Sequence, residues 1–189
     1  QIRSDLKDQV EKFKKEGRIL EAHRLDQKVN YDLAQIEEFG FVNGIENYSR
    51  YFDKRQPGDP PYTLLDYMNY NAKKFGKKNF LTVIDESHIS LPQIIGMYRG
   101  DRSRKETLID YGFRLPAALD NRPLNFIEFQ ARTPQTLYAS ATPQELELSL
   151  SQGEKAPAIA QQLVRPTGLL DPEVKVFPTA NQIAHLVSE

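Results

Sequence analysis

Two adjacent carboxylates at the end of an apolar run are the residues best suited to chemistry in this chain. The run covers residues 80–84 and leads into Asp85, Glu86 and His88 within the string DESH. Such a run predicts a strand buried on both faces, and ligands of α/β folds gather at the carboxyl ends of such strands. Asp85 would hold Mg²⁺ through water, and Glu86 would orient or deprotonate an attacking water. DESH is therefore a candidate DExH box, with a solvated strand exit as the alternative.

A second strand pattern, residues 135–139, ends in Ser140 and Thr142 within the string SATP. SATP resembles the third motif of helicase-type ATPases, whose hydroxyl groups link nucleotide state to nucleic-acid contact. The alternative is a helix N-terminus, with either hydroxyl residue as the cap and Pro143 at the first helical position. Both interpretations can hold together.

His88 has three possible roles. A metal triad with Asp85 and Glu86 is disfavoured, because no H-E-x-x-H spacing exists and the other two histidines are remote in sequence. A hydrogen bond across a nucleotide site is the functional interpretation. An ordinary loop histidine is the structural one.

Composition excludes several classes of protein. The 189 residues are 39% apolar, which suffices for a buried core, and the net charge of −1 means that nucleic-acid binding must be local. The absence of cysteine excludes disulfides and thiol catalysis. No apolar run approaches the roughly 20 residues of a membrane span, and no signal-peptide core is present. We therefore expect a cytoplasmic chain without membrane contact.

A phosphate-binding loop of the form G-x-x-x-x-G-K-[ST] is missing from this sequence. The nearest string has Gly76 and Lys77, but Lys78 follows where Ser or Thr is needed and Asn71 replaces the first glycine. The chain also begins with Gln1. We expect that a longer protein has been cut here and that this chain alone is inactive.

The elements that position the two motifs follow from periodicity. Apolar spacings of three and four over residues 2–39 predict two amphipathic helices divided at Gly17. Residues 57–61 predict a turn. Residues 68–79 hold four lysines and are expected to form an exposed loop, with DNA contact as the minority interpretation.

The connection between the two strands, residues 89–134, carries helical signals over 103–111 and 126–131. A strand, helix, strand order predicts parallel pairing. Within the connection, Arg99 and Arg102 belong to a dense basic patch beside an aromatic residue. These cations suit phosphate contact, but three acidic residues between 101 and 110 are equally placed to pair with them on a helix.

Several longer strings occur along the chain in addition to the two motifs. In order with those motifs they are GIENYSR at 44–50, PPYTLLDY at 60–67, DESH, GMYRGDRSRKETL at 96–108, YGFRLPAALDNRPL at 111–124, SATP and RPTGLLDPEV at 165–174. Together these strings resemble the UvrB family, the damage-verifying subunit of the bacterial UvrABC excision nuclease. The resemblance covers about residues 1 to 180, in order.

The resemblance implies an α/β fold, namely part of a RecA-like parallel-sheet lobe of helicase superfamily 2 with an N-terminal helical appendage. Residues 1–60 would belong to an added DNA-handling domain, 61–164 to the later half of the first lobe, and 165–189 to a connector toward the second lobe. The family's phosphate loop, aromatic hairpin, UvrA-docking domain and second lobe are absent from these residues. A sheet without its first strand would expose edges and apolar surface, so we expect self-association.

The resemblance also assigns site residues. Asp85 corresponds to the Mg²⁺-associated carboxylate, Glu86 to the catalytic base, and His88 completes the box. Ser140 and Thr142 match the motif that couples nucleotide to DNA. Weaker DNA candidates are Gln93, Arg99, Arg102, Phe113 and Arg114, whose alternatives are capping, ion pairing and core packing.

The function implied is nucleotide excision repair. In the complete protein the cofactors would be ATP and Mg²⁺, and the partners damaged duplex DNA, UvrA and UvrC. The alternative is a standalone module that binds nucleic acid or protein and keeps a relic DExH box.

Overall fold

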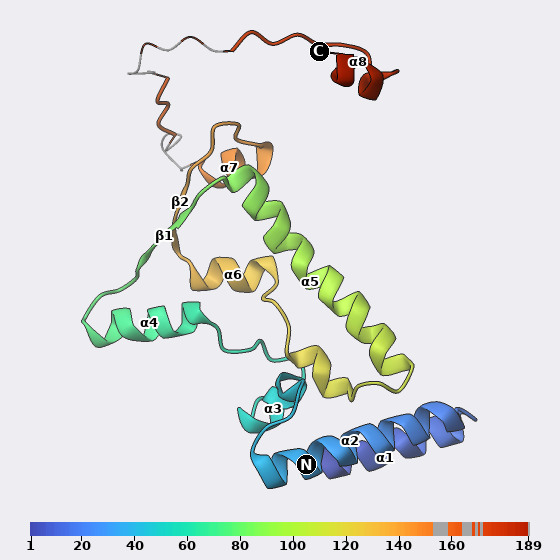
Figure 1. The fold of residues 1–189 in the computed structure, drawn as a ribbon. Coiled ribbons are helices and arrows are strands. Elements are labelled where there is room, and N and C mark those ends of the chain that lie inside the picture. The colour runs from blue at the N-terminus through green and yellow to red at the C-terminus, as the bar shows by residue number, and fades with distance from the viewer. Residues whose placement is uncertain (153–158, 164–167, 169, 171, 189) are drawn as a thin grey trace. The chain divides into compact units, whose positions relative to one another are not determined.

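The computed structural model describes residues 1–152, 159–163, 168, 170 and 172–188. The chain divides into two units, Gln1–Leu150 and Ser151–Glu189. The first is mostly helical with one two-stranded parallel sheet, and the second contains helix α8, Gln182–Ser188 (Figure 1). Within the described part of the chain, no helix is both long and apolar enough to span a bilayer.

A helical hairpin opens the chain, as predicted. Helices α1, Ile2–Lys15, and α2, Ile19–Phe39, lie side by side (Figure 1) and are joined at Gly17, whose φ of 76° is left-handed. The Arg18 amide donates to the Phe13 carbonyl at 2.8 Å and closes the α1 terminus.

The hydrophobic core lies mainly between these two helices. Their buried apolar side chains meet at the helical spacing of three and four, and two residues from later segments join them. The cluster consists of Leu6, Phe13, Ala22, Leu25, Val29, Leu33, Tyr48 and Leu115. The hairpin therefore supplies most of the apolar burial.

Two short helices follow the hairpin, η1 at Ile45–Tyr48 and α3 at Ser49–Phe52. Helix α4, Leu64–Lys74, comes next and corrects the loop prediction for residues 68–74, whereas residues 75–79 are turn or coil as predicted.

The start of α4 is fixed by a capping box. Thr63 and Asp66 exchange hydrogen bonds between their side chains and backbone, and Asp66 also accepts from Arg132 Nε at 2.9 Å. None of the residues of α4 is buried, so its apolar positions give no core-facing stripe. Capping and polar contacts, rather than burial, hold this helix.

The sheet pairs β1, Leu81–Ile84, with β2, Gln135–Tyr138, in parallel, which confirms the predicted strand pairing. The predicted burial of β1 on both faces is wrong, since only Ile84 is buried and Val83 is 59% exposed. Within the described residues, the face of the sheet that carries Val83 is left exposed.

Helix α5, Ser87–Asp110, begins inside the DESH string and is far longer than the predicted 103–111. Three helix-disfavouring residues, Pro92, Gly96 and Gly100, concealed it in the sequence. Leu91 is fully buried and anchors the first turns of this helix.

The remaining elements of the first unit are η2, Pro116–Asp120, α6, Phe126–Arg132, and α7, Glu145–Leu150. Helix α6 confirms the helical signal over 126–131. Helix α7 starts two residues after Pro143, so Pro143 is not at the first helical position as the capping interpretation required.

Part of the predicted connector, 165–189, lies outside the described residues. The described portion includes α8 and an edge contact between Phe177 and His185, whose ring centroids are 4.4 Å apart.

Candidate functional site

The two sequence motifs meet at the carboxyl ends of the paired strands. The register aligns Ile84 with Tyr138, and the ladder continues through the Ala139 amide to the Ile84 carbonyl at 2.9 Å. The Ser87 amide then donates to the Ala139 carbonyl at 3.0 Å. Backbone pairing alone therefore brings DESH and SATP together.

His88 links the motifs through its side chain. Its Nδ1 lies 2.8 Å from Ser140 Oγ and 3.4 Å from Glu86 Oε2. The Ser140 hydroxyl also accepts the Thr142 amide at 3.1 Å. A single histidine thus contacts the candidate base and the candidate coupling hydroxyl, and its role at a nucleotide site stays a prediction.

Glu86 occupies a left-handed backbone conformation, with φ 45° and ψ 49°, just before α5. This conformation costs a non-glycine residue roughly 1–2 kcal/mol. Asp85 supports the turn, because its Oδ1 accepts the Glu86 amide at 3.0 Å and its carbonyl accepts Ser90 Oγ at 2.9 Å. The turn presents both carboxylates to solvent.

The donor set at this turn fits a water-mediated magnesium ion better than a fully coordinated metal. The described residues contain no cluster of three or more His, Cys, Asp or Glu that could hold a metal ion. Mg²⁺ keeps several waters and uses one or two carboxylates with substrate phosphates. Asp85 and Glu86 match that need, as hard oxygen ligands on an exposed turn.

A buried carboxylate behind the turn was missed by the sequence analysis. Glu147 of α7 is buried and lies within 3.4 Å of Ser87 Oγ. Burial raises the pKa of the nearby Tyr138 hydroxyl, and the charge of Glu147 adds to that effect. No local sequence pattern predicts this contact, because 60 residues separate Ser87 from Glu147.

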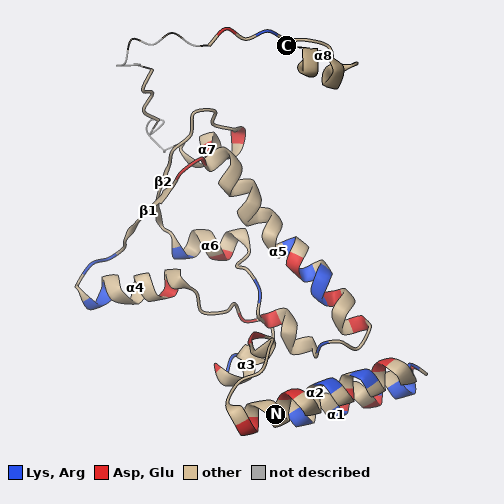
Figure 2. Cartoon of the chain, viewed as in Figure 1, with Lys and Arg blue, Asp and Glu red and all other residues tan. Residues whose placement is uncertain are grey.

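The basic patch favours the pairing interpretation for most of its cations. Arg102 pairs with Glu106 at 2.8 Å, and Asp101 pairs with both Arg104 at 3.0 Å and Lys105 at 2.8 Å. Figure 2 shows these charges on the second half of α5, while the half next to the strands carries none. Arg99 is exposed and has no carboxylate partner in the described part of the chain.

The other DNA candidates are divided between the two ends of α5. Gln93 is exposed near its start, whereas Phe113 and Arg114 follow its end. At 1.5 Å per residue, the helix separates Gln93 from Asp110 by roughly 25 Å but from Ser87 by only about 9 Å. The structure therefore places Gln93 near DESH along α5 and separates Phe113 and Arg114 from it.

Phe113 is held by α2. The Arg24 guanidinium lies 4.4 Å from the Phe113 ring centroid and donates to the Tyr111 carbonyl at 2.6 Å. The ring remains 44% exposed. Arg24 was not singled out in the sequence, since only the tertiary fold reveals its stacking partner.

A buried ion-pair joint connects the hairpin to η2. Arg50 contacts Asp120 at 2.7 Å and Asp5 at 3.0 Å, and Asp120 also accepts the Gly58 amide at 2.8 Å. Arg122 donates to the Gly58 carbonyl at 3.1 Å. These bonds clamp the predicted turn over 57–61 against η2.

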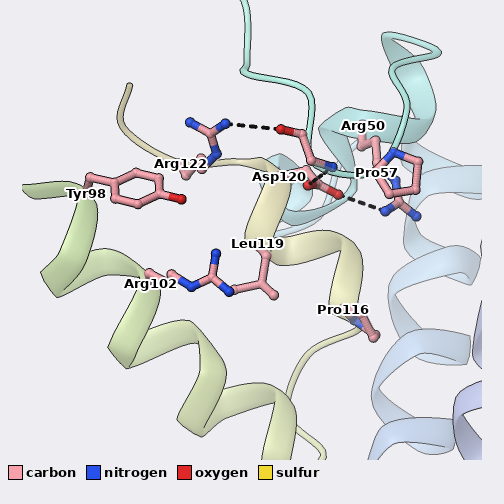
Figure 3. Close-up of a pocket in the computed structure, with 9 residues that line it drawn as sticks. Arg50, Pro57, Tyr98, Arg102, Pro116, Leu119, Asp120 and Arg122 are labelled. Atoms are coloured by element: carbon pink, nitrogen blue, oxygen red, sulfur yellow. Dashed lines mark hydrogen bonds and ion pairs between the residues drawn. The ribbon is translucent and has the colours of Figure 1, made fainter. Parts of the chain in front are cut away.

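The joint borders a cavity of about 420 Å³, shown in Figure 3 with Tyr98 and Arg102 on its α5 side. Each cation that lines it has an acidic partner: Arg50 has Asp120, Arg102 has Glu106, and Arg122 has Glu128. Because these cations are already paired, we interpret the cavity as part of the packing between segments and not as a ligand site.

The described residues define a mixed helical chain whose small parallel sheet gathers acidic and hydroxyl side chains at one edge. Comparison with known proteins places this chain more narrowly. Residues 1–54 match the family described as the UvrB third helical domain. UvrABC system protein B from Leptospira biflexa is 54% identical, that from Francisella tularensis 53% and that from Thermotoga maritima 52%.

Each of these matches covers 100% of the chain but 26% of the relative. The chain is similar over its whole length to UvrABC system protein B, and it spans about a quarter of the length of the curated relatives it matches.

Proposed function

We propose that this chain supplies the Walker B half of an ATP site and part of a damaged-DNA-binding face in a nucleotide excision repair protein. The observation that carries the proposal is the 2.8 Å contact between His88 Nδ1 and Ser140 Oγ, which joins two motifs 52 residues apart. Similarity to UvrABC system protein B over the whole chain supports the repair role.

The proposed fold is part of a RecA-like lobe. The parallel pairing of β1 with β2 and the position of DESH at their carboxyl ends support it. Residues 1–60 would form a DNA-handling segment, 61–164 the later half of the lobe, and 165–189 a connector. The complete protein would act in the cytoplasm with UvrA, UvrC and damaged duplex DNA.

The roles follow from the geometry of the turn. Asp85 would hold the magnesium ion through water, and the ion would neutralise phosphate charge when bound. Glu86 would orient or deprotonate water, and His88 would hold the Glu86 carboxylate in place relative to Ser140. Thr142 would stabilise the Ser140 turn through its backbone amide.

The DNA face would use the residues beyond α5, namely Phe113 and Arg114, with Gln93, Arg99 and Arg102 along the helix. Exposure of the Phe113 ring beside a cation supports base stacking.

ATP hydrolysis in the longer protein that contains this chain tests the proposal. Glu86→Gln should reduce the DNA-stimulated rate by roughly 10²–10⁴-fold, the usual contribution of a general base. Glu173→Gln is the matched control, because this exposed acid lies outside both motifs and pairs, among the described residues, with exposed Lys175. The 189-residue chain alone should be inactive.

A binding module with a relic DExH box is the second candidate, and the missing G-x-x-x-x-G-K string favours it. A longer protein that hydrolyses ATP equally well with Glu86→Gln would establish this candidate and overturn the first.

A further inference from the structure

A second, more polar cavity of about 280 Å³ is lined by Arg114, the residue that follows Phe113 in the chain. Its lining comes from η1, from the second half of α5 and from the segments on either side of η2. Side chains that are distant in sequence therefore converge on one small polar space, which we call the cationic pocket.

Four cations line the cationic pocket, namely Arg104, Lys105, Arg114 and Arg122. Two carboxylates, Asp101 and Glu46, line it as well. The lining is therefore enriched in positive charge, although the chain as a whole carries a net charge of −1.

The two lining carboxylates do not neutralise this charge. Asp101 is shared between Arg104 and Lys105, and their hydrogen bonds outweigh the cost of burial and hold its pKa below the usual range. Glu46 contacts the Asn47 amide at 3.4 Å. Outside the lining, Glu128 neutralises Arg122.

Arg114 is the cation left without a carboxylate within the described residues. Within the described residues, Arg114 Nη1 donates a hydrogen bond to the carbonyl of its neighbour Phe113 at 3.2 Å. The side-chain amide of Asn121, also in the lining, makes no hydrogen bond to the described part of the chain. Arg114 and Asn121 thus leave polar donors for an anion, and Arg104 is largely exposed beside them.

The residue that precedes Arg114 in the chain indicates which kind of anion the pocket would bind. Arg114 follows Phe113, whose exposed ring is stacked on Arg24. An exposed aromatic ring whose neighbour in the chain lines a cationic recess fits one nucleotide unit, with the base on the ring and the phosphate in the recess. A free phosphate ion would use the recess alone.

We propose that the cationic pocket binds a backbone phosphate of a nucleic-acid strand whose neighbouring base stacks on Phe113. This inference rests on the proposed DNA-binding function and adds Arg104 and Asn121 to its contacts. Lys105 is a positioning residue, because it is buried and bonded to Asp101 and to the Asn121 carbonyl.

The test is fluorescence anisotropy of a labelled oligothymidylate with the full chain over a range of NaCl concentrations. Arg104→Ala and Arg114→Ala should each weaken binding by about tenfold, the usual effect of losing a charge-assisted hydrogen bond. Each should also lower the slope of log K against log salt by about 0.7. Arg114→Lys should keep the slope, because it keeps the charge.

Arg3→Ala is the matched control, since Arg3 is an exposed arginine paired with Glu37 on the hairpin. It should leave affinity and slope unchanged. Urea unfolding of every variant, with stability equal to the parent chain, ensures that lost binding is not lost folding.

Two further measurements distinguish a nucleic-acid strand from free phosphate as the ligand. Phe113→Leu should weaken binding with no change in salt slope, because it removes stacking and no charge. Inorganic phosphate, compared with NaCl at equal ionic strength, should compete only weakly. Strong competition by phosphate together with indifference to Phe113→Leu would overturn the strand proposal in favour of a free-phosphate site.

The outcomes separate the two proposals. The pocket inference alone fails if Arg104→Ala and Arg114→Ala behave like Arg3→Ala. In that case the chain would still bind the oligonucleotide, and Phe113→Leu would still weaken that binding. If neither this chain nor the longer protein binds the oligonucleotide, the proposed DNA-binding face fails with it.

Discussion

At the scale of single residues, Gly112 shows how the fold places Phe113. Its φ of 72° is left-handed, and an added Cβ would lie 2.5 Å from the Glu21 carbonyl oxygen of α2. Arg18 and Arg24 bond the same turn from α2, at Asp110 and at the Tyr111 carbonyl. The turn before Phe113 is therefore fitted against the hairpin.

Gly112→Ala should destabilise the chain by roughly 2–3 kcal/mol, because it combines backbone strain with a backbone clash. Gly17→Ala is the control. Gly17 has a similar φ of 76° but nothing within 4 Å, so it should lose only about 1 kcal/mol. Urea unfolding measures both, and equal losses would contradict the close approach of α2.

Residue chemistry was predictable where it depends on local order. DESH and SATP are recognisable in the sequence because a strand end and a turn are short-range features. Parallel pairing of their strands then places both motifs at one edge of the sheet. The contacts of Ser87 with Glu147 and of Arg24 with Phe113 were not predictable, since sequence spacing says nothing about side chains that meet through tertiary packing.

At the scale of elements, α2 is stabilised by its buried stripe. Leu25 is 0% exposed within the core, whereas Leu20 on the same helix is 66% exposed. Leu25→Ala should lower the free energy of unfolding by about 2–5 kcal/mol and Leu20→Ala by less than about 0.5 kcal/mol. Chemical denaturation checks this, and similar losses at the two sites would contradict the packing of the hairpin.

Helix α6 should confer acid sensitivity through Glu128. Arg122 donates two hydrogen bonds to this carboxylate, at 2.7 and 2.9 Å, and holds its pKa below 4.5 despite partial burial. A carboxylate with a depressed folded-state pKa stabilises the fold above its unfolded pKa. That stability is lost as the pH falls through the folded pKa.

Glu128→Gln should therefore cost about 1 kcal/mol at pH 7, allowing for solvent screening, and the difference from the parent chain should shrink below about pH 4.5. Urea titrations at pH 7 and pH 3 measure it. A difference that is constant across this range would show that the lost stability comes from packing and not from charge.

Elements were predictable where the sequence itself carries a periodic or compositional signal. The hairpin follows its buried stripe, and α6 and both strands follow their patterns although α6 and β2 bury no residue, whereas α5 contains Pro92 and two glycines and α4 buries nothing. The capping box at Thr63 stabilises α4, and the buried side chain of Leu91 stabilises α5. Such contributions outweigh local propensity without leaving a periodic signal.

At the scale of the whole molecule, the exposed sheet face should promote self-association. Leu81, Val83 and Leu137 are each at least half exposed, and Val83 pairs with Leu137 in the register. Apolar side chains on an open strand pair favour intermolecular pairing. The average sedimentation coefficient should therefore rise with chain concentration, and Val83→Lys should suppress the rise. A monomer at all concentrations would contradict this prediction.

The incomplete burial of this sheet explains why the predicted double-sided strand was wrong. An apolar run indicates that a strand is buried in some assembly. It does not indicate that the covering layers lie within the same 189 residues. The matched relatives are about four times as long as the chain, and their length agrees with that explanation.

The most direct test of the account is whether DESH and SATP act as one unit through His88. The measurement is a double-mutant cycle of His88→Ala and Ser140→Ala on DNA-stimulated ATP hydrolysis by the longer protein. Because the two side chains share the 2.8 Å contact, each single change should lower the rate and the double change should lower it little further. Losses that multiply independently would contradict the claim that these two motifs form one ATP site.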